Sequence, residues 1–184
     1  IVALSTDKAA NPVNLYGATK LCSDKLFVNA NYLSGTKGTI FGVVRYGNVI
    51  SSRGSVVPYF KKMIREGKKV LPLTHHDMTR FFITLPDAIK FVVNCFSLLK
   101  KGEIFIPKMP SILISDLIKA LNPKAKIKII GIRPGEKIHE TLCSKDESNY
   151  LYENKNHFII YTPTLDIRRK VGKKVKENFV YSSD

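Results

Sequence analysis

Strand-like and helix-like segments alternate along this chain, and no other feature constrains its fold as strongly. Helices are predicted at 13–33, 57–67, 87–99, 114–121 and 135–142, the longest of them with apolar residues three and four positions apart. Short runs rich in β-branched or aromatic residues predict strands at 1–4, 39–46, 70–73, 103–106 and 126–132. This alternation favours an α/β fold with a mainly parallel sheet. The pattern weakens after Lys145, so we expect an irregular tail there.

The charge of the chain limits its partners. It has 30 Lys and Arg residues against 15 Asp and Glu, a formal net charge of +15. The excess is spread along the sequence, with one dense block at 168–176. A nucleic-acid footprint would gather on one face, so we expect solvated surface lysines and no nucleic-acid partner. A basic surface still favours anionic ligands, among them the phosphates of a nucleotide.

Neither a membrane segment nor a metal site is expected. No apolar run reaches the roughly 18 residues that a membrane-spanning helix needs. The three cysteines, Cys22, Cys95 and Cys143, are far apart and odd in number. They argue against a disulfide framework and suit a cytoplasmic location. The His-His-Asp run at 75–77 has no distant fourth ligand, which favours a loop over a metal site.

Polar side chains follow two of the predicted strands, at 5–8 and 47–54. Ligands of parallel sheets bind at the carboxyl ends of strands, so we look for chemistry there. Tyr16 and Lys20 are four residues apart in the next predicted helix and therefore share one face. Such spacing also fits a surface pair. In a site, the ammonium would lower the pKa of the phenol, which could then take a proton from a sugar hydroxyl.

The run from Leu4 to Lys20, LSTDKAANPVNLYGATK, resembles the active-site stretch of the extended short-chain dehydrogenases/reductases. Within them it is most similar to the inverting UDP-N-acetylglucosamine 4,6-dehydratases of pseudaminic acid synthesis. The Tyr-x-x-x-Lys spacing marks only the superfamily. The Thr-Asp-Lys triplet is more specific, because dehydratases of glucose nucleotides usually place Glu where Lys8 stands. Further stretches that fit are 45–49, 53–58, 78–82 and 132–137.

The resemblance implies a hydro-lyase that forms a 4-keto-6-deoxy sugar nucleotide with inverted C5 by internal hydride transfer. Tyr16 would take the C4 hydroxyl proton while hydride passes to NADP⁺, with NAD as the alternative. Lys20 would lower the pKa of the tyrosine and hold the nicotinamide ribose, and Thr6 would hydrogen-bond the C4 oxygen. Lys8 would remove the C5 proton and Asp7 would protonate the departing C6 hydroxyl. A lysine base must be neutral, so its pKa would have to be depressed by burial or by neighbouring cations.

The same resemblance implies the binding residues for a UDP-sugar, with no metal. Arg133 is expected at the phosphates and Glu136 at the ribose, and Val49 joins Tyr16 and Lys20 at the cofactor. A guanidinium and free amides in the loop at 53–55 suit a phosphate, although each arginine alone also fits a surface ion pair. The remaining substrate-binding residues expected are Asn48, Arg53, Gly54, Ser55, Val56, Val57, Thr79 and Arg80.

A dinucleotide-binding fold needs a glycine-rich turn after its first strand, and none precedes Tyr16. The chain opens on Ile1 rather than Met, so we expect a piece of a longer protein whose N-terminal cofactor half is missing. This leaves the activity of the chain alone in doubt. An open sheet edge invites association, so we expect a homo-oligomer at full length.

We expect three regions along the chain. Residues 1–50 would be the remainder of a Rossmann-type domain with the active-site strand and helix. Residues 51–164 would be a small mixed nucleotide-sugar-binding region with elements that return to the Rossmann sheet, and 165–184 a basic C-terminal tail.

Two other functions fit the same residues. A nucleotide-sugar 4-epimerase or reductase of the same superfamily would share Tyr16 and Lys20 but would not need Asp7 and Lys8 as an elimination pair. A basic nucleic-acid-binding module would use the block at 168–176, and the even spread of the remaining charge argues against it.

Overall fold

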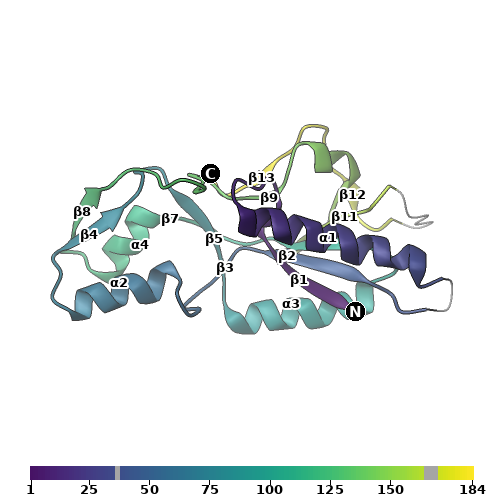
Figure 1. Ribbon diagram of the computed structural model, residues 1–184, viewed down its shortest axis with the longest axis horizontal. Helices are drawn as coiled ribbons and strands as arrows, with labels where there is room; N and C mark the ends of the chain where they lie inside the picture. The colour runs from purple at the N-terminus through teal and green to yellow at the C-terminus, as the bar shows by residue number, and fades with distance from the viewer. Residues whose placement is uncertain (36–37, 164–169) are drawn as a thin grey trace.

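The computed structural model describes residues 1–35, 38–163 and 170–184, and its largest element is a six-stranded sheet (Figure 1). In spatial order the strands are β1 (Val2–Thr6), β2 (Gly42–Tyr46), β6 (Ile104–Pro107), β11 (His157–Ile160), β10 (Leu151–Glu153) and β12 (Lys173–Lys174). The pairs β1–β2 and β2–β6 are parallel, and the remaining three pairs are antiparallel. The expected parallel α/β sheet is therefore present, and it continues in an antiparallel extension.

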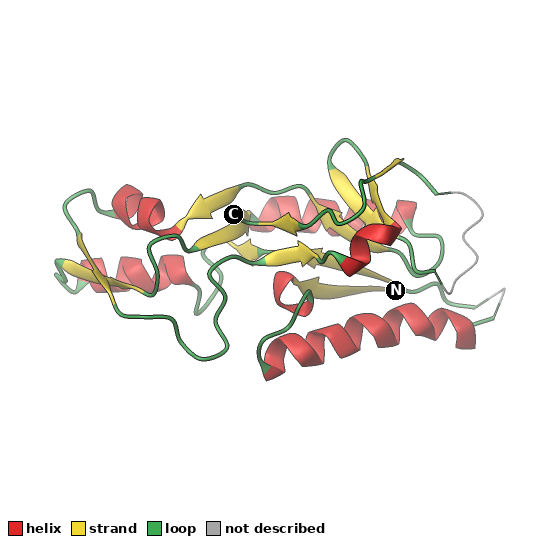
Figure 2. Ribbon diagram, turned by 90° about the horizontal axis from the view of Figure 1, so that it is seen from above, coloured by secondary structure: helices red, strands yellow, loops and turns green. Residues whose placement is uncertain are grey.

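Two helices, α1 (Leu15–Leu33) and α3 (Leu85–Leu98), cover opposite faces of the parallel strands, as Figures 1 and 2 show. Successive side chains of a strand point to opposite faces, so neighbours on β2 enter different cores. Val43 packs in the cluster that contains Val28 of α1, whereas Val44 packs in the cluster that contains Cys95 of α3. This layer order leaves the carboxyl ends of β1 and β2 free to carry a site.

A smaller part of the molecule lies beyond these strand ends, at the left of Figure 1. It contains α2 (Val56–Arg65), α4 (Ile114–Leu121), the parallel pair β4 (Val70–Leu73) and β8 (Lys126–Ile129), and the sheet β3 (Asn48–Val49), β5 (Thr79–Ile83) and β7 (Ser111–Leu113). Strand β5 links the two parts, because Phe81 packs in the core of the large sheet and Phe82 in the core of the smaller part. Both phenylalanines are buried.

The prediction of a helix at 135–142 is wrong. Residues 133–140 form turns, and β9 (Thr141–Cys143) follows them. The side chain of Arg80 donates to the carbonyls of Lys137 and Ile138 at 2.9 Å each, carbonyls that a helix would use for its own hydrogen bonds. Gly135 adopts a φ of 75°, in the left-handed region. A contact from a distant strand therefore decides the form of this loop.

The irregular tail predicted after Lys145 is also wrong. The short 3₁₀ helix η2 (Asp146–Tyr150) leads into the β10–β11 hairpin, and β13 (Tyr181–Ser182) pairs with β9. Phe158 and Ile160 of β11 are buried in the core of the large sheet. Arg168 and Arg169 of the basic block lie outside the described residues. Within the described residues, no helix combines the length and the hydrophobicity needed to cross a membrane.

Candidate active site

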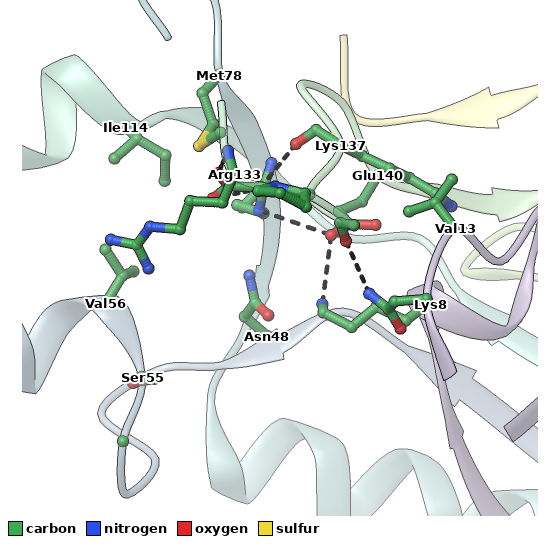
Figure 3. A pocket seen from close by; sticks show the side chains of 16 residues that line it. Lys8, Val13, Asn48, Ser55, Val56, Met78, Ile114, Arg133, Lys137 and Glu140 are labelled. Atoms are coloured by element: carbon green, nitrogen blue, oxygen red, sulfur yellow. Dashed lines mark hydrogen bonds and ion pairs between the residues drawn. The ribbon is translucent and has the colours of Figure 1, made fainter. Parts of the chain in front are cut away.

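The ends of β1 and β2, the start of α1 and the loop 133–140 surround two adjoining cavities. The first has a volume of about 450 Å³ and is shown in Figure 3. The second, of about 530 Å³, opens towards Tyr16 and Lys20. Four residues line both: Lys8, Asn48, Gly54 and Ser55. The polar clusters that follow two predicted strands thus meet at one edge of the sheet.

A single 3₁₀ turn, η1 (Asp7–Ala9), follows β1 and presents the Thr-Asp-Lys triplet. The hydroxyl of Thr6 accepts from the backbone N–H of Lys8 at 3.4 Å and donates to Oδ1 of Asp7 at 2.8 Å. Nζ of Lys8 lies 3.0 Å from the same carboxylate oxygen. Asp7 is fully buried, whereas Lys8 keeps a third of its side chain exposed to the cavities. The acid and the base expected from the sequence are therefore in direct contact.

Helix α1 brings the tyrosine–lysine pair to the second cavity. Asn14 caps the helix by accepting from the N–H of Gly17 at 2.8 Å. A Cβ on Gly17 would lie 2.4 Å from the carbonyl oxygen of Lys8, so only glycine lets the helix approach η1 this closely. Tyr16 is 54% exposed, and Nζ of Lys20 donates to the carbonyl of Leu4 at 3.2 Å. Both side chains line the cavity, on the shared face that their spacing predicts.

The charges around Lys8 oppose the expectation of a neutral lysine. Burial lowers the pKa of Lys8, but the carboxylates of Asp7 and Glu140 outweigh it and raise the pKa above its ordinary value. Nζ of Lys8 lies 3.4 Å from Oε1 of Glu140 as well as 3.0 Å from Asp7. In this structure Lys8 is thus a bound ammonium, and its use as a base requires that it first lose a proton.

Arg80 of β5 organises the opposite wall of the first cavity. Besides the two loop carbonyls, it lies 3.7 Å from Glu140 through Nε and 3.8 Å from Glu136 through Nη2. The N–H of Arg133 donates to Glu136 at 3.2 Å, which closes the turn that carries its side chain. The loop is thereby held with Arg133, Glu136 and Glu140 on the cavity wall.

A second lysine, Lys137, belongs to the same charged cluster. Its ammonium donates to the carbonyl of Ala10 at 2.7 Å and makes no ion pair within 4.0 Å among the described residues. Burial lowers the pKa of Lys137, and the neighbouring cations Lys8 and Arg80 add to this effect against the attraction of Glu140 and Asp7. The pKa values of the two lysines of the cavity are therefore shifted in opposite directions.

The structure brings most of the expected binding residues to the cavities. Val57 and Thr79 line neither of these two. Val57 is buried in the core of the smaller part, and the hydroxyl of Thr79 bonds His139 at 2.8 Å and Ser183 at 2.7 Å. Lining the first cavity are Asn48, Gly54, Ser55, Val56, Arg80, Arg133 and Glu136; lining the second are Val49 and Arg53, together with Asn48, Gly54 and Ser55.

Sequence reasoning missed several lining residues. Lys137 and Glu140 face the first cavity beside Lys8, and Met78 and Ile114 form its apolar side. A third cavity of about 330 Å³ continues from this side between α2 and β4. Tyr59 and apolar side chains line most of it, and Arg133 and Glu136 line it as well. Lys137 ends the family-like stretch at 132–137, whereas the one signal available for Glu140 was its place four residues after Glu136. Among the described residues no group of three or more His, Cys, Asp or Glu side chains is arranged to hold a metal.

Comparison with known proteins reveals close relatives. The model of a family described as polysaccharide biosynthesis protein matches residues 1–162. A UDP-N-acetylglucosamine 4,6-dehydratase (inverting) from Campylobacter jejuni subsp. jejuni serotype O:2 is 56% identical over the whole chain and 58% of its own length. A UDP-glucose 4-epimerase from Rickettsia canadensis is 42% identical over 80% of this chain and 44% of its own length. The chain thus spans a little over half the length of the first of these relatives.

Solved structures share the fold. The X-ray structure of Pen from Bacillus thuringiensis superposes with a TM-score of 0.87 at 38% identity, over 100% of this chain and 57% of that one. A dTDP-glucose 4,6-dehydratase from Streptomyces venezuelae, solved with NAD bound, has a TM-score of 0.63 at 19% identity, over 74% of this chain and 49% of its own. The second likeness concerns the fold alone.

Proposed function

Because this chain belongs to the polysaccharide biosynthesis protein family, we propose that it forms the catalytic and sugar-binding part of an inverting UDP-N-acetylglucosamine 4,6-dehydratase. The proposal concerns the full-length protein, since the chain spans 58% of the length of the similar dehydratase. The observation that carries it is the 3.0 Å contact between Asp7 and Lys8 beside the cavity lined by Tyr16 and Lys20.

A 4,6-elimination needs a base at C5 and an acid at C6 on neighbouring positions. Asp7 and Lys8 supply both from one turn at a strand end, and Lys8 reaches both cavities. In the proposed reaction Lys8 removes the C5 proton after the ketone at C4 has made it acidic. Asp7 then gives a proton to the departing C6 hydroxyl. An epimerase has no step that requires this pair.

Tyr16 is the proposed base for the C4 hydroxyl, with Lys20 stabilising the phenolate and Thr6 hydrogen-bonding the C4 oxygen. Thr6 lines the second cavity together with Tyr16 and Lys20, which supports this assignment. The half-exposed position of Tyr16 leaves its hydroxyl accessible to a sugar. The fixed place of Lys20 near the carbonyl of Leu4 keeps its charge on the cavity wall.

The second cavity is the proposed site of a nicotinamide cofactor, NADP, with NAD as the alternative. Its residues fit such a group. Ser5 Oγ is buried there with no hydrogen-bond partner, and Tyr16, Lys20 and Val49 offer a hydroxyl, an ammonium and an apolar contact. These suit the ribose hydroxyls and the nicotinamide ring. When bound, the cofactor supplies reversible hydride acceptance at the sugar.

The first and third cavities are proposed to receive the nucleotide sugar. The Arg133 guanidinium suits the pyrophosphate and Glu136 the ribose hydroxyls. Asn48 and the backbone at Gly54, where φ is 77°, support the same ligand from the opposite wall. The third cavity, whose wall includes Tyr59, Phe60 and Leu73, suits the base.

The proposal includes the setting of the enzyme. We infer a cytoplasmic homo-oligomer in pseudaminic acid synthesis, and the three free cysteines suit that compartment. The division at 1–50, 51–164 and 165–184 is proposed on the same basis. Strands β6 and β11 support it, because both return from the second region to the large sheet.

The test is to incubate the full-length protein with UDP-N-acetylglucosamine and NADP⁺ or NAD⁺ and to identify the product by NMR. We expect a 4-keto-6-deoxy sugar nucleotide with inverted C5. Lys8→Ala should abolish elimination while cofactor binding, followed by fluorescence, is spared. Lys155→Ala, at an exposed lysine of the β10–β11 turn, is the matched control and should keep wild-type activity. Dehydration by the Lys8→Ala variant would remove Lys8 from the mechanism.

A second candidate is a nucleotide-sugar 4-epimerase, favoured by the 42% identity to the epimerase from Rickettsia canadensis. It would use Tyr16 and Lys20 in the same way. Recovery of UDP-N-acetylgalactosamine, with no 4-keto-6-deoxy sugar, would establish this function and overturn the dehydratase. Lys8→Ala would then leave turnover intact, because epimerisation involves no proton transfer at C5.

A further inference from the structure

Resting on the proposed function, we propose that Glu140 is a positioning residue for Lys8. Its buried carboxylate holds the Lys8 ammonium against Asp7 and thereby sets the pH range in which Lys8 can act as a base.

The first observation is the place of the Lys8 ammonium between two carboxylates. Nζ lies 3.0 Å from Oδ1 of Asp7 and 3.4 Å from Oε1 of Glu140. A dashed line in Figure 3 marks the contact with Glu140. The two acidic side chains are 0% and 4% exposed, so water replaces neither contact. Asp7 comes from the turn after β1 and Glu140 from the loop before β9, so only the fold brings them together.

The second observation is how firmly Glu140 is held. Its N–H donates to Oγ of Ser183 at 2.9 Å, and its carbonyl accepts from the N–H of Ser183 at 2.9 Å. Arg80 lies 3.7 Å from the same carboxylate oxygen that faces Lys8. The hydroxyl of Ser183 also bonds Thr79, which fixes the C-terminal strand against β5. The carboxylate is thus aimed at Lys8 by a backbone clamp and by a buried guanidinium.

The third observation is a pair of unused acceptors. Oδ2 of Asp7 and Oε2 of Glu140 are buried and have no hydrogen-bond partner. Buried polar atoms are normally paired, so each unpaired one calls for an explanation, and here Glu140 also lines the first cavity. In each carboxyl group, the oxygen that Lys8 does not contact is therefore without a hydrogen bond and could carry a proton.

The position of the proton shared by Lys8 and Asp7 shows how Glu140 affects the proposed reaction. Asp7 carboxylate plus Lys8 ammonium contains the same protons as Asp7 carboxylic acid plus Lys8 amine. Moving one proton from Nζ to Asp7 breaks one N–H bond, forms one O–H bond, and leaves the acid and the base that elimination requires. Glu140 opposes this transfer, because its charge stabilises the ammonium. It therefore controls how readily Lys8 becomes neutral.

The charged or titratable groups that contact Lys8 or line a cavity with it come from six parts of the chain. They are Asp7 on η1, Tyr16 and Lys20 on α1, Tyr46 on β2, Arg53 in the loop after β3, Arg80 on β5, and Arg133, Glu136, Lys137 and Glu140 on the loop before β9. His139 is turned to Thr79 and away from this group. Burial acts on both lysines. The pKa of Lys8 is raised because it touches two carboxylates, whereas the pKa of Lys137, which bonds only a carbonyl, is lowered.

The experiment compares Glu140→Gln, which removes the charge, with Glu140→Asp, which keeps it, in the full-length protein. Removing a neighbouring anion makes the ammonium easier to deprotonate. The rising limb of the pH–rate profile for dehydration should therefore move about one unit to lower pH in Glu140→Gln. Glu140→Asp should keep the limb near its wild-type position at a reduced rate. Glu153→Gln, which breaks the exposed 2.6 Å pair with Lys108, should leave the profile unchanged.

A second readout does not depend on activity. NMR titration of ¹⁵N-labelled lysine side chains, assigned with Lys8→Arg and Lys137→Arg, should show Lys8 losing its proton at higher pH than Lys137 in the wild type. Glu140→Gln should bring the Lys8 titration to lower pH. If Glu140→Gln does not fold, the order of the two wild-type titrations decides.

The outcomes separate this inference from the proposed function. An unmoved pH profile together with an unmoved Lys8 titration in Glu140→Gln would overturn it, even if the enzyme is a dehydratase. So would a wild-type Lys8 that titrates below Lys137. A shifted Lys8 titration in a protein without dehydratase activity would support the coupling and overturn the function.

Discussion

Replacing Arg45 with methionine tests what holds helix α1 over the sheet. Arg45 is fully buried on β2, and its guanidinium joins Asp24 of α1 to Glu147 of η2. Nε donates to Asp24 at 2.8 Å, and Nη1 donates to Glu147 at 3.0 Å and to the carbonyl of Leu142 at 3.2 Å. Methionine fills much of the same volume but leaves both carboxylates without their cation.

We expect Arg45→Met to lower the free energy of unfolding at pH 7 by about 3–5 kcal/mol, the usual cost of removing one partner from a buried ion pair. At an effective dielectric constant of about 20, two charges separated by the 2.8 Å of the Arg45–Asp24 contact attract by about 6 kcal/mol. The desolvation of Arg45, which the variant no longer suffers, offsets part of this. Because Asp24 is only 1% exposed, water cannot take the place of the guanidinium.

The difference in the free energy of unfolding between the wild type and Arg45→Met should become smaller as the pH falls. In the wild type, burial opposes ionisation of Glu147, but Arg45 outweighs burial and lowers the pKa of Glu147 below its usual range. The stability that this group contributes is present above its unfolded-state pKa and is lost as pH falls through the folded-state pKa. In the variant, only the hydrogen bond from Ser144 and the charge of Lys25 still oppose the effect of burial on Glu147, so the pKa of Glu147 is higher than in the wild type. Lowering the pH therefore reduces the free energy of unfolding of the wild type, because it removes the contribution of the Arg45–Glu147 pair. The variant lacks this pair and loses nothing from it.

Urea unfolding followed by circular dichroism at pH 7 and about pH 4 measures both effects. The triple variant with Asp24→Asn and Glu147→Gln should recover part of the loss, since it removes the unpaired charges. Lys62→Met, which breaks an exposed 3.9 Å pair with Glu66, is the control and should change stability by less than about 0.5 kcal/mol. A loss below about 1 kcal/mol for Arg45→Met, or one that does not vary with pH, would refute the reasoning.

Two further outcomes follow from packing. Gly17→Ala places a methyl group 2.4 Å from the carbonyl oxygen of Lys8. We therefore expect the free energy of unfolding, measured in urea, to fall by about 1–3 kcal/mol. A variant as stable as the wild type would contradict the close approach of α1 to η1. Of the three thiols, only Cys22 is exposed, and burial raises the pKa of Cys95 to about 12 and that of Cys143 further still. A thiol-reactive dye at pH 8 should therefore label one cysteine rapidly in the native protein and three after denaturation, whereas rapid native labelling of more than one would show that the cores are open.

Local patterns predicted most of the elements. The run at 70–73 forms β4 with the predicted bounds, and the helix predicted at 114–121 is α4. These segments are short, and their apolar residues contact the nearest core. The segment at 135–142 was predicted as a helix and is a loop, because Arg80 takes two of its carbonyls. The strands after Lys145 pair with partners far away in the sequence, which no local period reveals.

In the candidate site too, some contacts follow from the local sequence and others depend on the tertiary fold. Asp7 and Lys8 are adjacent, and Tyr16 and Lys20 are one helical turn apart, so their contacts or shared face follow from spacing. Glu140 reaches Lys8 only through the fold of β9 and the clamp from Ser183. The pKa of Lys8 depends on that distant carboxylate, and it is raised where a lone lysine base would need it lowered.

By itself the sequence determined the alternation of strands and helices, the residues at the strand ends, the adjacency of Asp7 and Lys8, and the shared face of Tyr16 and Lys20. These depend on periodicity and on neighbours within one turn of chain. The tertiary structure decided which carboxylates surround Lys8, in which direction the pKa of Lys8 and that of Lys137 are shifted, and that Arg45 ties α1 to the sheet. The reason is physical: ionisation and burial depend on distances of about 3–4 Å between groups, and only the folded chain sets those distances.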